Sequence, residues 1–140
     1  MKTINLNLNI NTKPKFLNNI TDEVFQYVEN SKISNGLCSL FIKHSSASLL
    51  IQENADPDVL KDIESFFRRI VPEDETLYKH NSEGPDDMPA HIRSLLTSTS
   101  VSIPIINSKL ELGTWQGIYL FEHRKVPKIR EVVAKLQSDI

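Results

Sequence analysis

The spacing of hydrophobic positions changes along the chain, and each change predicts a different element. Apolar and polar side chains alternate between residues 2 and 10, with isoleucine and leucine on one face and asparagine on the other. A period of two predicts a half-buried strand. We expect a short second strand near residues 15–19, so the chain opens on two strands.

Helical spacing follows in three places, each with a recognisable start. Thr21 precedes two acidic residues and is expected to cap a first helix with an apolar stripe. Asp56-Pro57 is a strong start signal for an amphipathic helix over residues 57–70, which Pro72 ends. A third helix is expected over about 89–97, with Asp86 or Asp87 as its cap, Pro89 tolerated near its start and His91 in its first turn.

The remaining apolar runs predict strands. They cover residues 37–43, 47–52, 100–106, 110–124 and 129–137. The first is expected to be central, Pro104 indicates an edge or a bulge, and 110–124 is one long strand or two broken at Gly113. Since strands cluster instead of alternating with helices, we predict an α+β fold, a sandwich of largely antiparallel sheets. At 140 residues the chain is expected to form a single domain, 1–140.

Composition and charge exclude several classes of protein. The net charge is −2 and basic residues form no long run, which argues against nucleic-acid and membrane-surface partners. No apolar run approaches the roughly 18 residues of a spanning helix. The alternating N-terminus lacks the apolar centre of a signal peptide, so we expect a cytoplasmic protein. The single cysteine, Cys38, lies in an apolar run and is expected in the core.

Residues 80–91 concentrate reactive side chains, with two of the four histidines and three carboxylates. Buried imidazoles and carboxylates are costly unless they are paired or bound to metal. We therefore expect a stiff functional loop that runs into the third helix. The alternative is a surface loop with a capping aspartate and incidental histidines.

Three other element boundaries carry chemistry. His44-Ser45-Ser46 ends a strand, residues 53–58 open a helix, and Gln116 with residues 122–124 lies along the penultimate strand. Alternation on that strand places Glu122 and Arg124 together and points His123 away from them. Each site has a structural alternative, which is capping for the helix start and a surface ion pair for Arg124.

These places suggest three chemistries. His44, His80 and His91 near carboxylates could form a zinc-type site, although their spacing matches no metal signature. Helix starts and Arg124 suggest an anion or phosphate pocket. A serine nucleophile at Ser45 or Ser46 beside His44 is the weakest of the three, because neighbouring residues on a strand point apart.

Three long motifs resemble the YjbQ-like family, also called the secondary thiamine-phosphate synthase family. They are HSSASLLIQENADPDV, HNSEGPDDMPAHI, and IPI followed by LGTWQGIYLFEHR, in the same order as in the family. The resemblance runs from about Thr21 to the C-terminus. Ser45 stands where the family usually has threonine, which keeps a hydroxyl group.

The resemblance implies a two-sheet sandwich of about seven strands with helices, assembled as a homotrimer with a polar cleft near the subunit boundary. It also implies that a pyrimidine diphosphate and a thiazole phosphate are joined with release of pyrophosphate. The chain lacks a glycine-rich phosphate loop and the repeated strand–helix pattern of a barrel, so we expect this reaction to be a secondary activity.

Two functions follow as hypotheses. The first is a transferase or hydrolase that uses a divalent metal, with zinc expected, or acid/base chemistry on a small phosphorylated molecule. The second is a non-catalytic trimer that binds a small anion or cofactor. The roles assigned for the first are metal binding by His44, His80 and His91, catalysis by Glu122, Asp87 and Glu53, and substrate binding by Arg124, Gln116, Asn54, Asp56, Ser46 and Trp115.

Overall fold

The computed structural model describes residues 2–13 and 16–140. Within them the elements in chain order are β1 (Thr3–Asn11), β2 (Leu17–Asn19), α1 (Thr21–Ser31), β3 (Gly36–Ile42), β4 (Ala47–Glu53), α2 (Pro57–Ile70), the 3-10 turn η1 (Glu75–Leu77), α3 (Asp87–Leu96), β5 (Ser100–Ile106), β6 (Lys109–Leu110), β7 (Gln116–Glu122) and β8 (Ile129–Ser138). Every predicted element is present. The segment around Gly113 breaks the predicted long strand into β6 and β7, and Lys15 of the predicted second strand lies outside the described residues.

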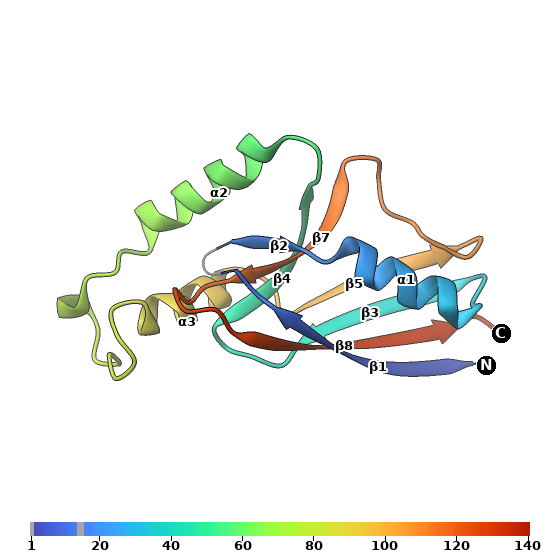
Figure 1. The fold of residues 1–140 in the computed structure, drawn as a ribbon, viewed down its shortest axis with the longest axis horizontal. Coiled ribbons are helices and arrows are strands. Elements are labelled where there is room, and N and C mark those ends of the chain that lie inside the picture. Colours follow the sequence, from blue (N-terminus) through green and yellow to red (C-terminus); the bar gives the residue numbers. More distant parts are fainter. Residues whose placement is uncertain (1, 14–15) are drawn as a thin grey trace.

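The strands form two antiparallel sheets. The larger has the order β1-β8-β3-β5-β6 and the smaller β2-β7-β4, as Figure 1 shows. β3 is central in the larger sheet, as its apolar run predicts. β5, which carries Pro104, is followed only by the two-residue β6, so most of its outer side is an edge. The α+β two-sheet fold is therefore confirmed, with three helices.

The core lies between the sheets and under α1. Alternation on β8 points Val132, Ala134 and Leu136 inward, and the apolar face of β1 meets them. Cys38 on β3 is fully buried, and burial raises the pKa of its thiol to about 12. The thiol therefore stays protonated and packs as a small apolar group.

Two of the expected helix caps are absent, because the capping groups bind elsewhere. α1 begins without a side-chain cap from the residue before it. The Thr21 hydroxyl instead donates to Asn19 Oδ1 at 2.6 Å and accepts from the Ile118 amide at 2.9 Å. The start of α3 likewise lacks a side-chain cap, since Asp86 and Asp87 both turn to other partners. α3 begins at Asp87, so His91 is its fifth residue and lies in the second turn, not the first.

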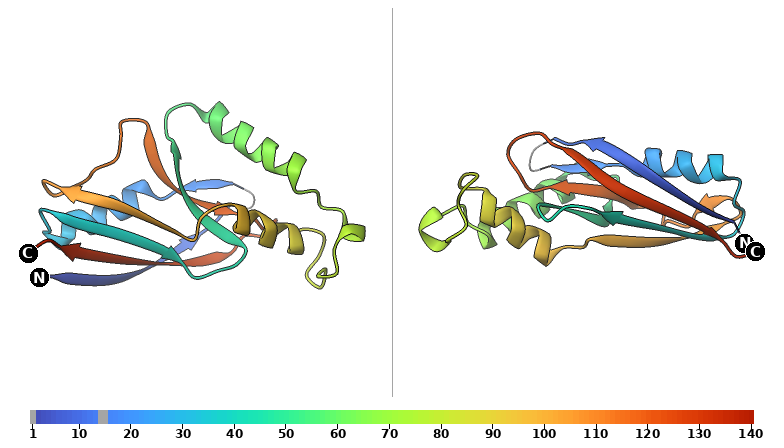
Figure 2. Two further views of the ribbon diagram at one scale, coloured as in Figure 1. Left: turned by 180° about the vertical axis from the view of Figure 1, so that it is seen from behind. Right: turned by 90° about the horizontal axis from the view of Figure 1, so that it is seen from below.

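α2 begins as predicted but packs little against its own chain. Asp56 Oδ1 accepts from the Asp58 amide at 2.9 Å, and Pro57 occupies the first turn. None of the residues of α2 is buried. In Figure 1 the helix extends away from the two sheets. Figure 2 shows α2 and α3 at the end of the molecule opposite both termini.

The helices of the described chain are unsuited to crossing a bilayer. None of them combines the length and the apolar character of a membrane span.

Candidate functional site

His80, Asp87 and His91 bring one ligand atom each to a single place. His80 Nε2 lies 3.2 Å and His91 Nε2 3.4 Å from Asp87 Oδ1, and the three ligand atoms lie within 4.8 Å of one another. Asp87 and His91 are four residues apart on α3 and therefore share one helix face, and the loop after η1 delivers His80. Ligands about 2.0–2.1 Å from a tetrahedral zinc ion are about 3.3 Å apart, which matches both distances.

Hydrogen bonds fix the orientation of these side chains. His91 Nδ1 lies 3.0 Å from the carbonyl oxygen of Ser45, which can only accept, so Nδ1 carries the ring hydrogen. Asp87 Oδ2 accepts from the Glu83 amide at 3.1 Å, which leaves Oδ1 directed at the two imidazoles. In neutral His91, Nε2 would then face Asp87 Oδ1 with a lone pair on each atom. That contact requires a second proton on the ring or a cation between the two groups.

The loop before α3 is held by Arg124. Its Nε donates to Asp86 Oδ2 at 3.1 Å, its Nη1 to Glu83 Oε2 at 2.8 Å and its Nη2 to the Glu83 carbonyl at 2.9 Å. Gly84 between them has a φ of 108°, a conformation that other residues rarely adopt. Arg124 therefore orients the turn that carries Asp87, and its donors are engaged within the chain.

The two aspartates at this turn are ionised near neutral pH. Burial alone would raise the pKa of Asp86, but the Lys125 amide and the Arg124 guanidinium outweigh it and hold the pKa below its usual value. For Asp87 burial is likewise outweighed, by the Glu83 amide and by the nearby positive charges, and its pKa is also lowered. Asp87 is thus prepared to bind a cation without releasing a proton.

Glu122 belongs to a separate buried ion pair. It is fully buried, and Arg130 on β8 donates from Nε to Glu122 Oε1 at 2.8 Å and from Nη2 to Oε2. Thr12 donates to Oε1, and the Arg124 amide donates to Oε2 at 3.1 Å. Both oxygens are occupied, so this environment differs from the one expected for a general base. Glu122 and Arg124 do not act as one polar pair, although His123 does point away from them as expected.

His44 lies outside the group formed by the other two histidines. Its Nε2 accepts from the Glu131 amide at 2.8 Å, and its Nδ1 lies 3.4 Å from Arg130 Nη1. Burial, followed by the charge of Arg130, lowers its pKa. Arg130 also donates to the Ser46 carbonyl at 3.1 Å. Within the chain, His44 and Ser46 therefore join the connection between β3 and β4 to β8, and His44 does not complete the expected set of three histidines.

Five predicted site residues gather at the other end of the small sheet. Glu53 pairs with Gln116 across β4 and β7, roughly 20 Å from the Ala47–Glu122 pair at the strand rise of about 3.3 Å. Their side chains make local turn contacts: Glu53 accepts from the Ala55 amide, Asn54 donates to the Thr114 and Gln116 carbonyls, Asp56 caps α2, and Gln116 accepts from the Gly113 amide. Trp115 is 63% exposed. These residues do not join the group around Asp87.

Sequence reasoning did not identify Thr12, Arg130 or Arg93. Arg130 had a usable signal, because alternation on β8 places it on the same inward face as Val132. An inward arginine requires a carboxylate partner, and Glu122 is the buried candidate. Arg93 had a weaker signal, since it lies in the predicted third helix among residues expected to be amphipathic.

Comparisons with known proteins agree with this architecture. Residues 5–139 match the family model described as UPF0047 protein YjbQ-like. A UPF0047 protein of Synechocystis sp. is 53% identical over 94% of this chain and 89% of its own length, and UPF0047 protein YjbQ of Escherichia coli O157:H7 is 41% identical over 94% and 96%.

Solved structures give the same result. A YjbQ/UPF0047 family protein of Clostridium acetobutylicum superposes with a TM-score of 0.84 at 38% identity, covering 94% of this chain and 99% of that one. A protein of unknown function from Sulfolobus solfataricus gives a TM-score of 0.88 at 28% identity and covers 99% of each chain. The chain therefore belongs to the YjbQ/UPF0047 family, whose members in these comparisons carry no assigned function.

Proposed function

We propose that this protein is a metal-dependent enzyme in which His80, Asp87 and His91 bind a divalent cation, with zinc the expected ion. The observation that carries the proposal is the contact between His91 Nε2 and Asp87 Oδ1 at 3.4 Å. The bond of Nδ1 to the Ser45 carbonyl gives both contacting atoms lone pairs in the neutral ring. A cation placed between them satisfies both atoms.

The ligand set fits zinc better than magnesium or calcium. Imidazole nitrogens suit zinc, whereas the two harder ions prefer oxygen ligands. Two histidines and one carboxylate leave a fourth position, as in catalytic zinc sites. His80 is about half exposed, so that position is open to a substrate from solvent. The Ser45 carbonyl and the Glu83 amide supply the outer contacts that orient metal ligands.

We further propose that the substrate is a small phosphorylated molecule and that the reaction is a transfer or a hydrolysis. A zinc ion bound there would polarise a phosphoryl oxygen or acidify a bound water. The bond from the Glu83 amide to Asp87 Oδ2 would keep Oδ1, the ligand oxygen of Asp87, in place. Arg124 would hold the loop before α3 through its bond to Glu83. Thiamine-phosphate synthesis as a secondary activity is supported by the family resemblance alone.

A non-catalytic binding protein is the second candidate, and one observation favours it. Glu122, one of the carboxylates predicted to be catalytic, is fully buried and bonded through both oxygens. The same metal site could therefore hold a small anion without turnover. An assay of pyrophosphate release from a pyrimidine diphosphate and a thiazole phosphate distinguishes the enzyme from the binding protein. The enzyme should release pyrophosphate only with zinc, and Asp87→Asn should abolish the release. The binding protein should release none.

We also propose that the protein is a homotrimer. The support is the apolar face of α2, where Phe66 and Ile70 are 48% and 47% exposed, together with Leu95 of α3 at 82%. Exposed apolar patches of this kind commonly mark interfaces between proteins. A further copy of the chain that packs against α2 would bury them.

Zinc titration of protein purified without a histidine tag tests the metal site. We expect one zinc ion per chain by calorimetry, and at least a hundredfold weaker binding in Asp87→Asn and in His91→Ala. His44→Asn is the matched control, because it removes an imidazole outside the group and should leave the stoichiometry unchanged. A protein that takes up no zinc, or variants that bind it as tightly as the wild type, would refute the proposal.

A further inference from the structure

Inside the described part of the protein, four nitrogen atoms of Arg93 and His123 have no hydrogen-bond partner. Arg93 on α3 is 1% exposed, and its Nε, Nη1 and Nη2 atoms make no hydrogen bond within the described residues. His123 is also 1% exposed, and its Nδ1 has no partner there. Buried polar side chains nearly always have partners, so two such groups together call for a physical explanation.

The donors of Arg93 are costly to leave unpaired. A guanidinium presents five N–H donors, stays charged at any relevant pH and accepts nothing. Burying such a group without an acceptor costs several kcal/mol, on the order of the penalty for an unpaired buried ion. An acceptor that carries negative charge removes that cost.

His123 contributes a second unpartnered nitrogen atom. Its Nε2 lies 2.9 Å from Ser48 Oγ, and Ser48 Oγ lies 2.6 Å from Thr97 Oγ1. The single hydroxyl hydrogen of Thr97 is directed at the Arg93 carbonyl at 2.8 Å, because a carbonyl can only accept. Ser48 therefore donates to Thr97, Nε2 donates to Ser48, and Nδ1 carries a lone pair. Burial, followed by the charge of Arg93, lowers the pKa of His123 to about 3, so the ring is neutral. The charge of Arg93 thus acts on an imidazole whose unpartnered Nδ1 is an acceptor.

Charged side chains of α2 act on Arg93, and α2 also borders a groove. The charges that act on Arg93 include those of Glu64 and Arg68 from α2. Phe67 of α2 packs edge-on against Phe121 at 5.5 Å between ring centres, and Phe121 lies 4.4 Å from the ring of His123. Phe67 is also one wall of a groove of about 680 Å³ between α2 and β4.

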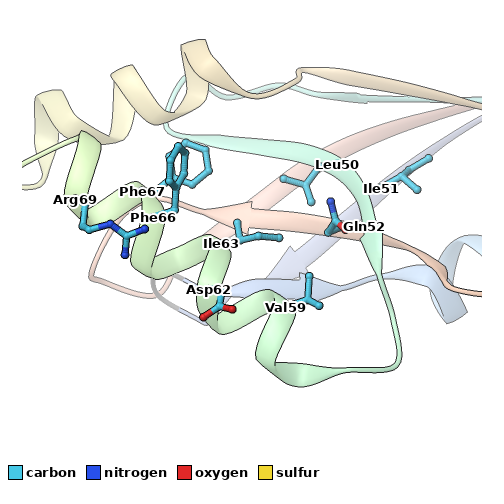
Figure 3. Close-up of a pocket in the computed structure, with 9 residues that line it drawn as sticks. All are labelled: Leu50, Ile51, Gln52, Val59, Asp62, Ile63, Phe66, Phe67 and Arg69. Carbon is cyan, nitrogen blue, oxygen red and sulfur yellow. The ribbon is translucent and has the colours of Figure 1, made fainter.

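Figure 3 shows Ile63 of α2 pointing across this groove toward Leu50, with Val59 and Asp62 of the same helix also lining it. None of the residues of α2 is buried, so the helix is held by few packed side chains. Arg93 is 1% exposed and does not line the groove, so a ligand can reach it only when the side chains around it move.

We propose that the unpartnered donors of Arg93 form an internal oxyanion site near His123, which binds a phosphate group. A tetrahedral oxyanion offers acceptors in several directions and takes a bidentate bond from a guanidinium. The site requires no metal and is separate from the one formed by His80, Asp87 and His91. The zinc site can therefore fail its test while this one passes, and the reverse.

Inorganic phosphate binding to metal-free protein, treated with a chelator, tests the proposal. We expect saturable binding by calorimetry, a thermal midpoint that rises with phosphate, and weak binding of acetate, which has one charge and two oxygens. Arg93→Met should weaken phosphate binding at least tenfold, and Arg93→Lys should retain part of it. Arg69→Met, which removes an exposed guanidinium of α2, should change neither measurement.

Stability without phosphate gives an independent readout. Because Arg93→Met removes an unpaired buried charge, its thermal midpoint without phosphate should equal or exceed that of the wild type, and phosphate should no longer raise it. The His123 Nδ1 resonance should shift with phosphate in wild-type protein, as measured by nitrogen NMR of the imidazole.

Three outcomes overturn the proposal. The first is wild-type protein that binds no phosphate, and the second is binding that survives in Arg93→Met. The third is a double-mutant cycle in which the effects of Arg93→Met and Glu64→Gln on the unfolding free energy are strongly coupled, while phosphate does not change the thermal midpoint. Glu64 would then be the counter-ion of Arg93. If Arg93→Met fails to fold, Arg93→Lys and the NMR titration of the wild type decide the question.

Discussion

The pair of Glu122 and Arg130 shows that an ionisable side chain in a family motif can stabilise the fold without taking part in catalysis. Glu122 was assigned as a base from its position near Arg124 on one strand. Folding instead gives it Arg130, from a strand eight residues later, and buries both. The carboxylate that carries the candidate site is Asp87, which contacts both clustered histidines.

Removing the Glu122 charge should destabilise the protein strongly. Glu122→Gln leaves Arg130 buried without a counter-charge, which typically costs about 3–5 kcal/mol of unfolding free energy. Urea unfolding monitored by circular dichroism measures the loss. Glu131→Gln is the control, because its pair with Lys43 is half exposed and should contribute less than about 1 kcal/mol. Equal effects of the two variants would contradict a structural role for Glu122.

His123 should make the fold sensitive to mild acid. Its pKa is lowered from 6.5 to about 3 in the folded protein, so the unfolded chain binds more protons between those values. Stability should fall as pH drops below 6.5, by about 2–3 kcal/mol between pH 7 and pH 4.5 from this residue alone. Urea midpoints at several pH values test this. His123→Asn should flatten that part of the profile, and a variant as acid-sensitive as the wild type would exclude His123 as the cause.

At the scale of the residue, sequence spacing could find only part of the site. Asp87 and His91 are four residues apart in a predicted helix, so their shared face was accessible from the sequence. His80 required a guess about a loop. The position of His44 depends on how β3 meets β8, and no local pattern encodes that contact. Site residues near Gln116 were grouped with the others because sequence does not reveal strand ends roughly 20 Å apart.

At the scale of the element, the periodicity of hydrophobic residues is sufficient to predict which helices and strands form and in which order. Strands and helices follow from spacing because one face of each must be buried, and α2 matches its predicted bounds. The caps of α1 and α3 were not predictable in the same way. Asp86 accepts a hydrogen bond from Arg124, and Asp87 accepts one from the Glu83 amide. These bonds replace the capping bonds to the first turn of α3 that the sequence predicts.

We expect neighbouring copies of the chain to bury the apolar face of α2. Phe66→Glu places a charge on that face, and we expect this variant to be a folded monomer if the proposed homotrimer forms through α2. Light scattering after size exclusion gives the mass, and circular dichroism confirms the fold. Lys61→Glu, on an exposed position of the same helix, should remain trimeric. A monomeric wild type, or a trimeric Phe66→Glu, would be inconsistent with this use of α2.

At the scale of the whole molecule, the hydrophobic core and the candidate site lie in different parts of the sandwich. The five-stranded sheet joins both termini to the core, and the small sheet presents α2, α3 and the loop between them at the far end (Figures 1 and 2). The candidate site is carried at this end by α3 and the loop before it, whereas α2, none of whose residues is buried, contributes no residue to it. Relatives in the family share this frame, with TM-scores of 0.84 and 0.88 for two solved structures.

The central claim is that His80, Asp87 and His91 form a metal site, and zinc-edge anomalous diffraction tests it most directly. Crystals of tag-free protein grown with zinc should show one anomalous peak per chain, about 2.0–2.2 Å from both Nε2 atoms and from Asp87 Oδ1. A map without a peak at saturating zinc, or with its strong peak on other residues while Asp87 stays bonded to the imidazoles alone, would contradict the account.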